Sequence, residues 1–483
     1  MLWFKRDKKE SRIQNNQSHD FHETKEKAFD LNIEKILENW EVYHAIREII
    51  ANALDEMTIT GTPHIDIVKD VNGFWHIRDY GRGLNYHHLT QKESEEKKAR
   101  KDVIGKFGIG LKDAFAVLYK NKINVQVISK HGNMTLKMMT KEGFTMETLH
   151  VVILPSADSE FEGTEFILNV TDEDVQKAKD LFVIFKNQKC LDKNEYGEIY
   201  EKANSNHANI YVHGMKIAEE ENYLFDYNIT KTNKQLEKNL SRERSNVGRT
   251  AYSGIIKNML LKSNSKVVAE TLVEQLRKIQ TGDKSDEMQL DIQVHAIKLY
   301  NRFEKVVFIS TSEAFRLTNN DKEKIKESKR KIVIIPDITY EKIKDLKDSE
   351  GNEIATFSTV CREYNENFQY KFVDINDLTE EEKEVLNLKR FVFAIYGDKK
   401  YYDRIFVSEN INEFISGDTR GVYESKEDRI ILKRSILFDE ALFFEVLFHE
   451  LVHATSGRPD NDRGFENQLG KIIGKLAVEL KNK

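Results

Sequence analysis

The chain has 483 residues, of which 39% are hydrophobic and 32% are charged, with a formal net charge of −6 at pH 7. This length exceeds what one hydrophobic core supports, so several domains are expected, and the mean hydropathy of −0.59 excludes a membrane-dominated protein. The first ten residues lack the apolar core of a signal peptide, and the two cysteines, Cys190 and Cys361, suggest no disulfide framework, so we expect a cytoplasmic protein with no membrane partner.

The N-terminal part predicts a tail followed by a helix. Residues 1–30 are polar and charged without apolar periodicity, which predicts a mobile tail. From Ile33 onward the apolar residues follow helical spacing. Glu48, Asn52 and Asp55 stand at i, i+4 and i+7 and would share one face of this helix. A carboxylate, an amide and a second carboxylate suit a water-activating base, a Mg²⁺ ligand and a polar support.

Two glycine-rich stretches follow this helix. Asp79 comes where a predicted strand ends in the turn DYGRGL, in which Gly81 and Gly83 allow the backbone to approach a flat ligand closely. The stretch IGKFGIGLKDAF then opens a second helix, whose free amides can hold phosphate oxygens. Its candidate phosphate-binding residues are Gly105, Lys106, Gly108 and Gly110.

In this order and spacing, the three stretches resemble the ATP-binding boxes of the GHKL superfamily, which includes gyrase B, heat-shock protein 90, histidine kinases and the MutL mismatch-repair proteins. The resemblance implies an α/β-sandwich ATP-binding domain at residues 31–200 that uses ATP and Mg²⁺. It makes Glu48 the general base for ATP hydrolysis, Asn52 the Mg²⁺ ligand and Asp79 the acceptor of the adenine amino group. Residues 85–103, charged and helix-prone, would form a lid over the nucleotide.

The alternating segments between residues 64 and 170 independently predict a mostly antiparallel sheet with one layer of helices, and His131 begins the hairpin turn HGN. VISKHGN and GTEFILNV look like strands of heat-shock protein 90 chaperones, which would place Thr164 beside the adenine. NLSRE resembles their middle-domain segment whose arginine reaches the γ-phosphate. The candidate sensors in the expected transducer segment, residues 201–285, are Arg242 and, as weaker candidates, Arg244 and Arg249.

The resemblance to the chaperones ends near residue 280, so chaperone function itself is not implied. Residues 286–400 alternate short apolar strands with charged, helix-prone stretches, which predicts an α/β connector domain. The strands are expected in KVVFIST, RKIVIIP and FQYKFVDI. This region carries no glycine-rich phosphate loop and no metal-binding pattern.

A second chemical centre lies in the C-terminal stretch FDEALFFEVLFHELVHATSG. Asp439 is the expected N-cap of a helix that ends at Gly457. His449 and His453, at i and i+4, can both reach one Zn²⁺. Glu450 would then act as the general base toward a metal-bound water, whose pKa zinc lowers to near 7.

A catalytic zinc site needs a third protein ligand and one open position. We expect Glu466, with Asp460 and Asp462 as alternatives, because a ligand on a helix is held more rigidly than one in a loop. The arrangement looks like small gluzincin-type metallopeptidases, in which a glutamate from the following helix completes the site. It implies a zincin-like α+β domain at residues 401–483, and the strand RIILKRS could be the edge along which an extended peptide adds.

The sequence therefore predicts an α/β multidomain, ATP-regulated zinc metallopeptidase that cleaves a protein or peptide. ATP binding would be sensed by Arg242 and accompanied by nucleotide-dependent homodimerisation. Such an enzyme would suit stress response or defence against foreign genomes in a bacterium. The first alternative is an ATP-driven, chaperone-like clamp with a structural or inactive zinc domain, but a structural site has no use for Glu450. A DNA-engaging clamp is disfavoured by the acidic net charge. A histidine kinase is disfavoured because His19 and His22 lie in a polar stretch without heptads.

Overall fold

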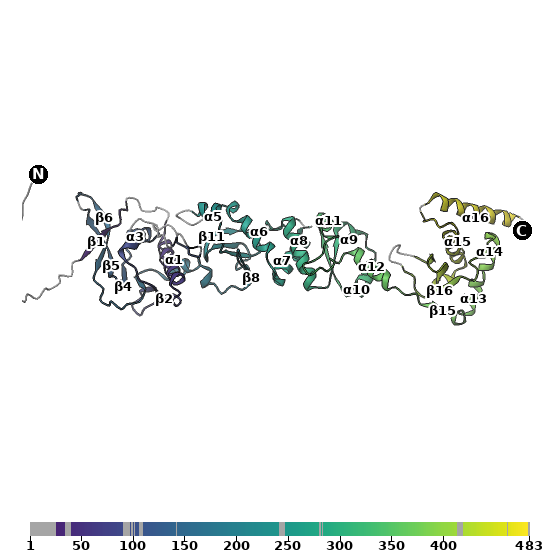
Figure 1. The fold of residues 1–483 in the computed structure, drawn as a ribbon, viewed down its shortest axis with the longest axis horizontal. Coiled ribbons are helices and arrows are strands. Elements are labelled where there is room, and N and C mark those ends of the chain that lie inside the picture. The colour runs from purple at the N-terminus through teal and green to yellow at the C-terminus, as the bar shows by residue number, and fades with distance from the viewer. Residues whose placement is uncertain are drawn as a thin grey trace, which may run out of the picture. The chain divides into compact units, whose positions relative to one another are not determined.

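The computed structural model describes residues 26–33, 40–89, 97, 100, 102–105, 110–141, 143–240, 247–279, 282, 284–412, 419–460 and 462–481. In these residues the chain is a mixed α/β, multidomain protein with four β-sheets (Figure 1). Its contacts divide it into two compact units, Met1–Val268 with Ser285–Ile292, and Ala269–Lys284 with Gln293–Lys483. No helix in the described parts has the length and apolar content needed to cross a membrane.

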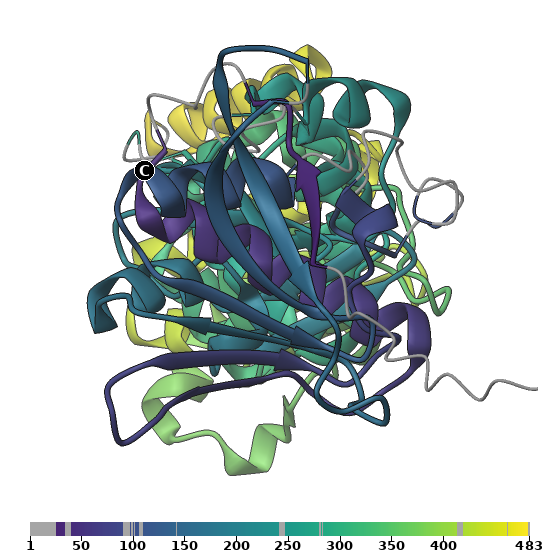
Figure 2. The same ribbon diagram turned by 90° about the vertical axis from the view of Figure 1, so that its left-hand side faces the viewer.

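The first sheet has seven strands in the order β1-β6-β5-β4-β7-β3-β2, and every neighbouring pair is antiparallel. Its strands are β1 (Lys27–Asp30), β2 (Asp66–Lys69), β3 (Trp75–Asp79), β4 (Val125–Ser129), β5 (Asn133–Thr140), β6 (Glu147–Leu154) and β7 (Thr164–Leu168). The helices α1 (Val42–Thr60), α3 (Gly110–Lys120) and α4 (Asp172–Lys179) share one hydrophobic core with it. Figure 2 shows α1 in purple behind the blue strands. The expected mostly antiparallel sheet with packed helices is confirmed.

Three local expectations for this region have different outcomes. The helix begins at Val42 rather than near Ile33, because Glu41 is an extended N-cap that forms a capping box with His44. Residues 27–30, expected as the end of a tail, form β1 on β6, while residues 1–25 lie outside the described residues. The HGN hairpin turn is confirmed between β4 and β5.

The second sheet has the order β11-β10-β12-β9-β8, and only the β10–β12 pair among these described strands is parallel. Its strands are β8 (Cys190–Asn194), β9 (Gly197–Tyr200), β10 (Ala208–Val212), β11 (Met215–Glu220) and β12 (Asp226–Ile229). The expected domain boundary between residues 200 and 201 falls inside this sheet, because β9 pairs with β12. The helices that follow are α5 (Lys234–Asn239), α6 (Ser253–Leu261), α7 (Lys266–Ile279) and α8 (Leu290–Phe303).

The third sheet is a parallel pair, β13 (Val306–Ser310) and β14 (Lys331–Ile335). Its helices are α9 (Thr311–Arg316), α10 (Asn319–Glu327), α11 (Asp337–Ile343) and α12 (Phe357–Asn367). Val307, Ile309, Ile325 and Val360 form its small core. The expected α/β alternation is therefore present, although the stretch FQYKFVDI contributes its short strand to the next sheet.

The fourth sheet has the order β15-β16-β18-β17 and lies in the C-terminal part of the chain. Its strands are β15 (Phe372–Val373), β16 (Ile405–Ser408), β17 (Gly421–Glu424) and β18 (Arg429–Lys433), and its helices are α13 (Glu380–Asn387), α14 (Lys389–Tyr396), α15 (Glu440–Ser456) and α16 (Arg463–Lys481). Among the described strands β18 lies between β16 and β17, so the expectation that it is an edge strand is wrong, and the edges are β15 and β17. These strands and helices share one hydrophobic core, to which Leu378 and Val392 also belong. The expected domain boundary at residue 401 therefore falls inside this core.

Candidate functional site

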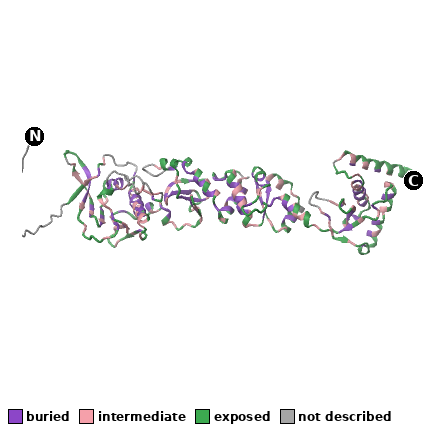
Figure 3. Cartoon of the chain, in the orientation of Figure 1, coloured by how far each residue is buried: buried purple, intermediate pink, exposed green. Residues whose placement is uncertain are grey.

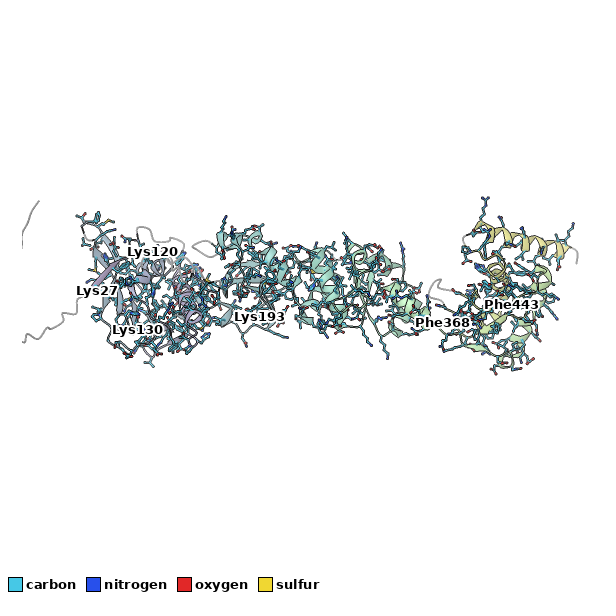
Figure 4. The ribbon with its side chains drawn as sticks, viewed as in Figure 1. Lys27, Lys120, Lys130, Lys193, Phe368 and Phe443 are labelled. Carbon is cyan, nitrogen blue, oxygen red and sulfur yellow. The ribbon has the colours of Figure 1, made fainter. Side chains whose placement is uncertain are left out.

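The HELVH residues lie on α15, whose limits match those expected from the sequence. The Asp439 side chain accepts a hydrogen bond from the Leu442 amide at 3.0 Å, and Gly457 ends the helix in the left-handed conformation. Seven residues of this helix between Phe443 and Val452 are buried, whereas α16 is largely exposed (Figure 3). Figure 4 labels Phe443, which is fully buried on α15. The apolar side chains of α15 therefore hold the motif against the fourth sheet.

Three potential metal ligands converge at the end of α15. His449 Nε2 and His453 Nε2 lie 2.8 and 2.9 Å from the same oxygen, Asp460 Oδ1, and 3.0 Å from each other. Among the described residues, this is the group of His, Cys, Asp and Glu side chains whose ligand atoms come close enough to hold one ion. A tetrahedral zinc with bonds of about 2.0 to 2.1 Å needs donor atoms roughly 3.3 Å apart, so a small outward adjustment would fit Zn²⁺.

The surroundings of the two histidines favour the metal-binding form. His453 Nδ1 lies 2.7 Å from the carbonyl oxygen of Arg458, so the proton belongs on Nδ1 and the Nε2 lone pair faces the cluster. Burial lowers the pKa of His449, which favours its neutral form. The ring of Phe465 packs against both imidazoles, with centroid separations of 4.9 and 4.5 Å.

Asp460, rather than Glu466, is the carboxylate beside the histidines. Glu466 is exposed in the first turn of α16, and that helix supplies Phe465 to the cluster instead. Asp462, the other alternative, accepts hydrogen bonds from Arg458 and from the Gly464 amide, each at 2.7 Å. The arrangement therefore favours Asp460, in the loop, as the third ligand over Glu466 on α16, which the sequence led us to expect.

Glu450 is held between α15 and the edge strand β17. It is 6% exposed and accepts a hydrogen bond from the Tyr423 amide. Gly421 makes this approach possible, because a Cβ there would lie 2.8 Å from Glu450 Cγ. Burial raises the pKa of Glu450 to about 7. A carboxyl group with such a pKa can take up and release a proton near neutral pH.

The second candidate site lies on α1 and α3. Glu48 is 2% exposed, and Arg47 Nε donates a hydrogen bond to its Oε1 at 3.0 Å. A Cβ on Gly110, the first residue of α3, would lie 2.1 Å from Glu48 Oε2. The absence of a side chain at Gly110 therefore lets the Glu48 carboxylate reach the start of α3, where helix amides attract negative charge.

Asn52 and Asp55 lie one and two turns further along the same face of α1. Asp55 is 1% exposed and accepts hydrogen bonds from the amides of Ile104 and Gly105, at 2.5 and 2.8 Å. Lys97, from the expected lid, places its Nζ 3.1 Å from Asn52 Oδ1 and 3.0 Å from Asp55 Oδ2. The sequence interpretation missed Lys97, because one lysine in a charged stretch gives no distinguishing signal.

Asp79 and Thr164 face each other in register at the ends of β3 and β7. Burial raises the pKa of Asp79 to about 6, although the Gly81 amide donates a hydrogen bond to its Oδ1 at 2.9 Å. Thr164 Oγ1 accepts a hydrogen bond from the Leu84 amide at 2.9 Å, directly after Gly83 with its φ of +86°. The DYGRGL turn and the start of β7 thus meet at a buried carboxyl.

The same turn is fixed by an ion pair that the sequence interpretation did not identify. Glu56 Oε1 accepts hydrogen bonds from Arg82 Nε at 2.8 Å and from the Arg82 amide at 2.9 Å. Gly81 permits this contact, because a Cβ there would lie 2.3 Å from Glu56 Cγ. Glu56 therefore holds the DYGRGL turn against α1.

Four expected site residues, Lys106, Gly108, Arg242 and Arg244, lie outside the described residues. Arg249, the remaining candidate sensor, forms ion pairs with Glu220 and Asp286. Arg249 thus forms its ion pairs with the last residue of β11 and with a residue between α7 and α8.

Together, the fold and these sites define a mixed α/β multidomain protein with a candidate His/Asp metal centre. Residues 173–266, from α4 to the start of α7, match the family described as the Mycoplasma pneumoniae MPN635 N-terminal domain. An uncharacterized protein of Mycoplasma pneumoniae is 39% identical over 243 residues, covering 49% of this chain and 98% of that protein. A second uncharacterized protein of the same organism is 25% identical over 309 residues, covering 56% of this chain and 82% of that protein. The chain belongs to the family of the first of these proteins.

Proposed function

We propose that the protein is an ATP-regulated zinc metallopeptidase that acts in the cytoplasm on a protein or peptide. The observation that carries this proposal is the convergence of His449, His453 and Asp460 on one point, with the buried Glu450 between the two histidines in sequence. A structural site would use four protein ligands and no adjacent base. Three ligands and a buried carboxyl suit a hydrolytic site better.

In this proposal each residue of the C-terminal site has one task. His449, His453 and Asp460 would hold Zn²⁺, which when bound acts as a Lewis acid and lowers the pKa of water. Glu450 would accept the proton of the attacking water and later release it, as its raised pKa allows. Glu466 as the third ligand stays a prediction, now secondary to Asp460.

The N-terminal region would bind ATP and Mg²⁺ in a GHKL-type domain. Support comes from Glu48 on α1, whose carboxylate lies beside the start of α3, from Asn52 on the same face of α1, and from Asp79 opposite Thr164. In this proposal Glu48 activates water, Asn52 contacts Mg²⁺ and Asp79 accepts the adenine amino group. Nucleotide-dependent homodimerisation and a γ-phosphate contact from Arg242 complete the regulatory part of the proposal.

The metal content of the purified chain tests the proposal without knowledge of a substrate. Elemental analysis should find about one zinc per chain in the wild type. His449→Ala and Asp460→Ala should lose it, because each removes one of three ligands, whereas Glu466→Ala should retain it. Circular dichroism of each variant controls for folding. A wild-type chain that holds no zinc after remetallation would exclude the peptidase and leave an ATP-driven clamp as the working hypothesis.

A further inference from the structure

Asp428 is the centre of a hydrogen-bond network in the turn between β17 and β18. Its Oδ1 accepts hydrogen bonds from the hydroxyls of Tyr401 and Tyr423, at 2.8 and 2.9 Å. Its Oδ2 lies 2.7 Å from Arg404 Nη1 and 3.1 Å from Lys400 Nζ. Its backbone adopts a φ of +50°, which a residue with a short polar side chain tolerates. We call Asp428, Tyr401 and Tyr423 the Asp428 network.

Both tyrosines of the Asp428 network lead back to the helix that carries the HELVH motif. Tyr423 lies two residues after Gly421, where a Cβ would lie 2.8 Å from Glu450 Cγ, and its backbone amide is a hydrogen-bond donor to the Glu450 carboxylate. Tyr401 is 2% exposed, and its hydroxyl lies 3.0 Å from the carbonyl oxygen of Ala454, the residue after His453. The chain of contacts therefore begins at Glu450 and returns to α15 one turn later.

This closed chain of contacts matters because β17 is an edge strand. Among the described strands it pairs with β18 alone, so its backbone hydrogen bonds leave its distance from α15 open to change. Tyr423 belongs to β17, and any shift of that strand would move the amide that orients Glu450. Asp428 connects the hydroxyls of Tyr423 and Tyr401 through hydrogen bonds, and the Tyr401 hydroxyl also contacts α15.

The geometry points to Tyr401, Tyr423 and Asp428 as positioning residues that fix the direction of the Glu450 carboxylate relative to the metal centre. This inference rests on the proposed zinc site. The three residues do not touch the metal ligands through their side chains in the described contacts, and they act through the Tyr423 amide and the Ala454 carbonyl. Groups that orient the residues around a metal without binding it change affinity or activity on the order of tenfold or more when removed.

Two metal-binding probes separate this role from simple structural support. Acetohydroxamate chelates a metal and also donates a hydrogen bond to a neighbouring carboxylate, whereas azide binds the metal alone. The experiment uses the full chain loaded with Co²⁺ and follows visible absorption as each probe is added. Tyr423→Phe and Tyr401→Phe remove only a hydroxyl group, and Tyr402→Phe is the matched control next to Tyr401.

We expect Tyr423→Phe and Tyr401→Phe to weaken acetohydroxamate binding on the order of tenfold, with azide affinity and cobalt content unchanged. Glu450→Gln should cause a similar loss, and Tyr402→Phe should cause none. Asp428→Asn keeps an acceptor oxygen, so it should retain more acetohydroxamate affinity than Asp428→Ala.

Acetohydroxamate affinity like the wild type in both tyrosine variants, while Glu450→Gln loses it, would overturn the inference and leave the proposed function standing. Loss of cobalt from the tyrosine variants would also overturn it, because the network would then support the ligands rather than Glu450. A wild-type chain that binds neither cobalt nor zinc would instead remove the proposed metal site, and this inference with it.

Discussion

Burial sets the protonation behaviour of three carboxyl groups in this protein. It raises the pKa of Asp79 to about 6, and of Glu287 and Glu450 to about 7. Asp79 and Glu450 belong to the two proposed sites, where a group that titrates near neutral pH has a use. Glu287 lies elsewhere: it is 3% exposed and accepts hydrogen bonds from the Tyr227 hydroxyl at 2.6 Å and the Leu224 amide at 2.8 Å.

Glu287 should make the stability of its region depend on pH. Its pKa is higher in the folded chain than the ordinary 4.5, so the folded state binds the proton more tightly, and stability falls as pH rises from about 4.5 to 7. A shift of this size corresponds to roughly 3 kcal/mol of unfolding free energy as an upper limit. Glu287→Gln, which carries no titrating group, should flatten the slope in that window.

Hydrogen exchange of the β12 amides at pH 5, 6 and 7 measures this local free energy of opening. Glu221→Gln, at an exposed glutamate of the same region, is the control and should leave the slope as in the wild type. If Glu287→Gln and the wild type lose protection equally as the pH rises, the slope has another source.

Single residues also show what sequence could and could not predict about the candidate site. His449, Glu450 and His453 were predictable because helical geometry alone fixes how residues one turn apart face each other. Asp460 reaches the same point through the turn after Gly457, and turn conformation has no periodicity from which its direction could be calculated. Lys97 and Tyr401 meet their partners only after distant segments have packed, which a local pattern does not encode.

At the scale of elements, α1 and α3 meet where a glycine is required. Gly110→Ala should force Glu48 or the start of α3 to move, because the new Cβ would lie 2.1 Å from the carboxylate. We expect a loss of about 1 to 3 kcal/mol in unfolding free energy, as for other overpacked core positions. Urea denaturation measures it.

Gly254→Ala is the matched substitution, because Gly254 also lies in the first turn of a helix but a Cβ there meets no atom within 4 Å. It should change stability by less than about 1 kcal/mol, in the stabilising direction. Equal stabilities of the two alanine variants would show that Glu48 does not occupy the space beside Gly110.

The limits of elements with strong local signals were predicted well, whereas the pairing of strands within a sheet was not. The limits of α15 follow from Asp439 and Gly457, which act within one turn of the helix ends. The position of β18 inside the fourth sheet depends on parallel pairing with β16, and the apolar run RIILKRS fits an interior strand as well as an edge. Strand pairs also cross the expected domain boundaries near residues 200 and 401, and such non-local pairing has no local signal in the sequence.

At the scale of the whole molecule, the proposed function joins two sites that lie in different compact units. Such coupling needs an element whose conformation both sites influence, and a typical coupling free energy is about 1 to 3 kcal/mol, or roughly 5- to 150-fold in an equilibrium constant. The family match over residues 173–266 covers the second sheet and lies between the two sites in sequence. We therefore place the connection, within the proposal, in the segment that also contains Arg242.

Hydrogen exchange of β17 and α15 with and without Mg²⁺ and a non-hydrolysable ATP analogue tests this coupling without a peptide substrate. In the wild type we expect nucleotide to change exchange there by at least about fivefold, the lower end of typical coupling. Asp79→Asn should abolish the effect by preventing nucleotide binding. Arg242→Ala should bind nucleotide and still abolish it, because the sensor and not the pocket is lost. Unchanged exchange in a wild-type chain that binds nucleotide would leave two independent sites on one chain and remove the regulatory part of the proposal.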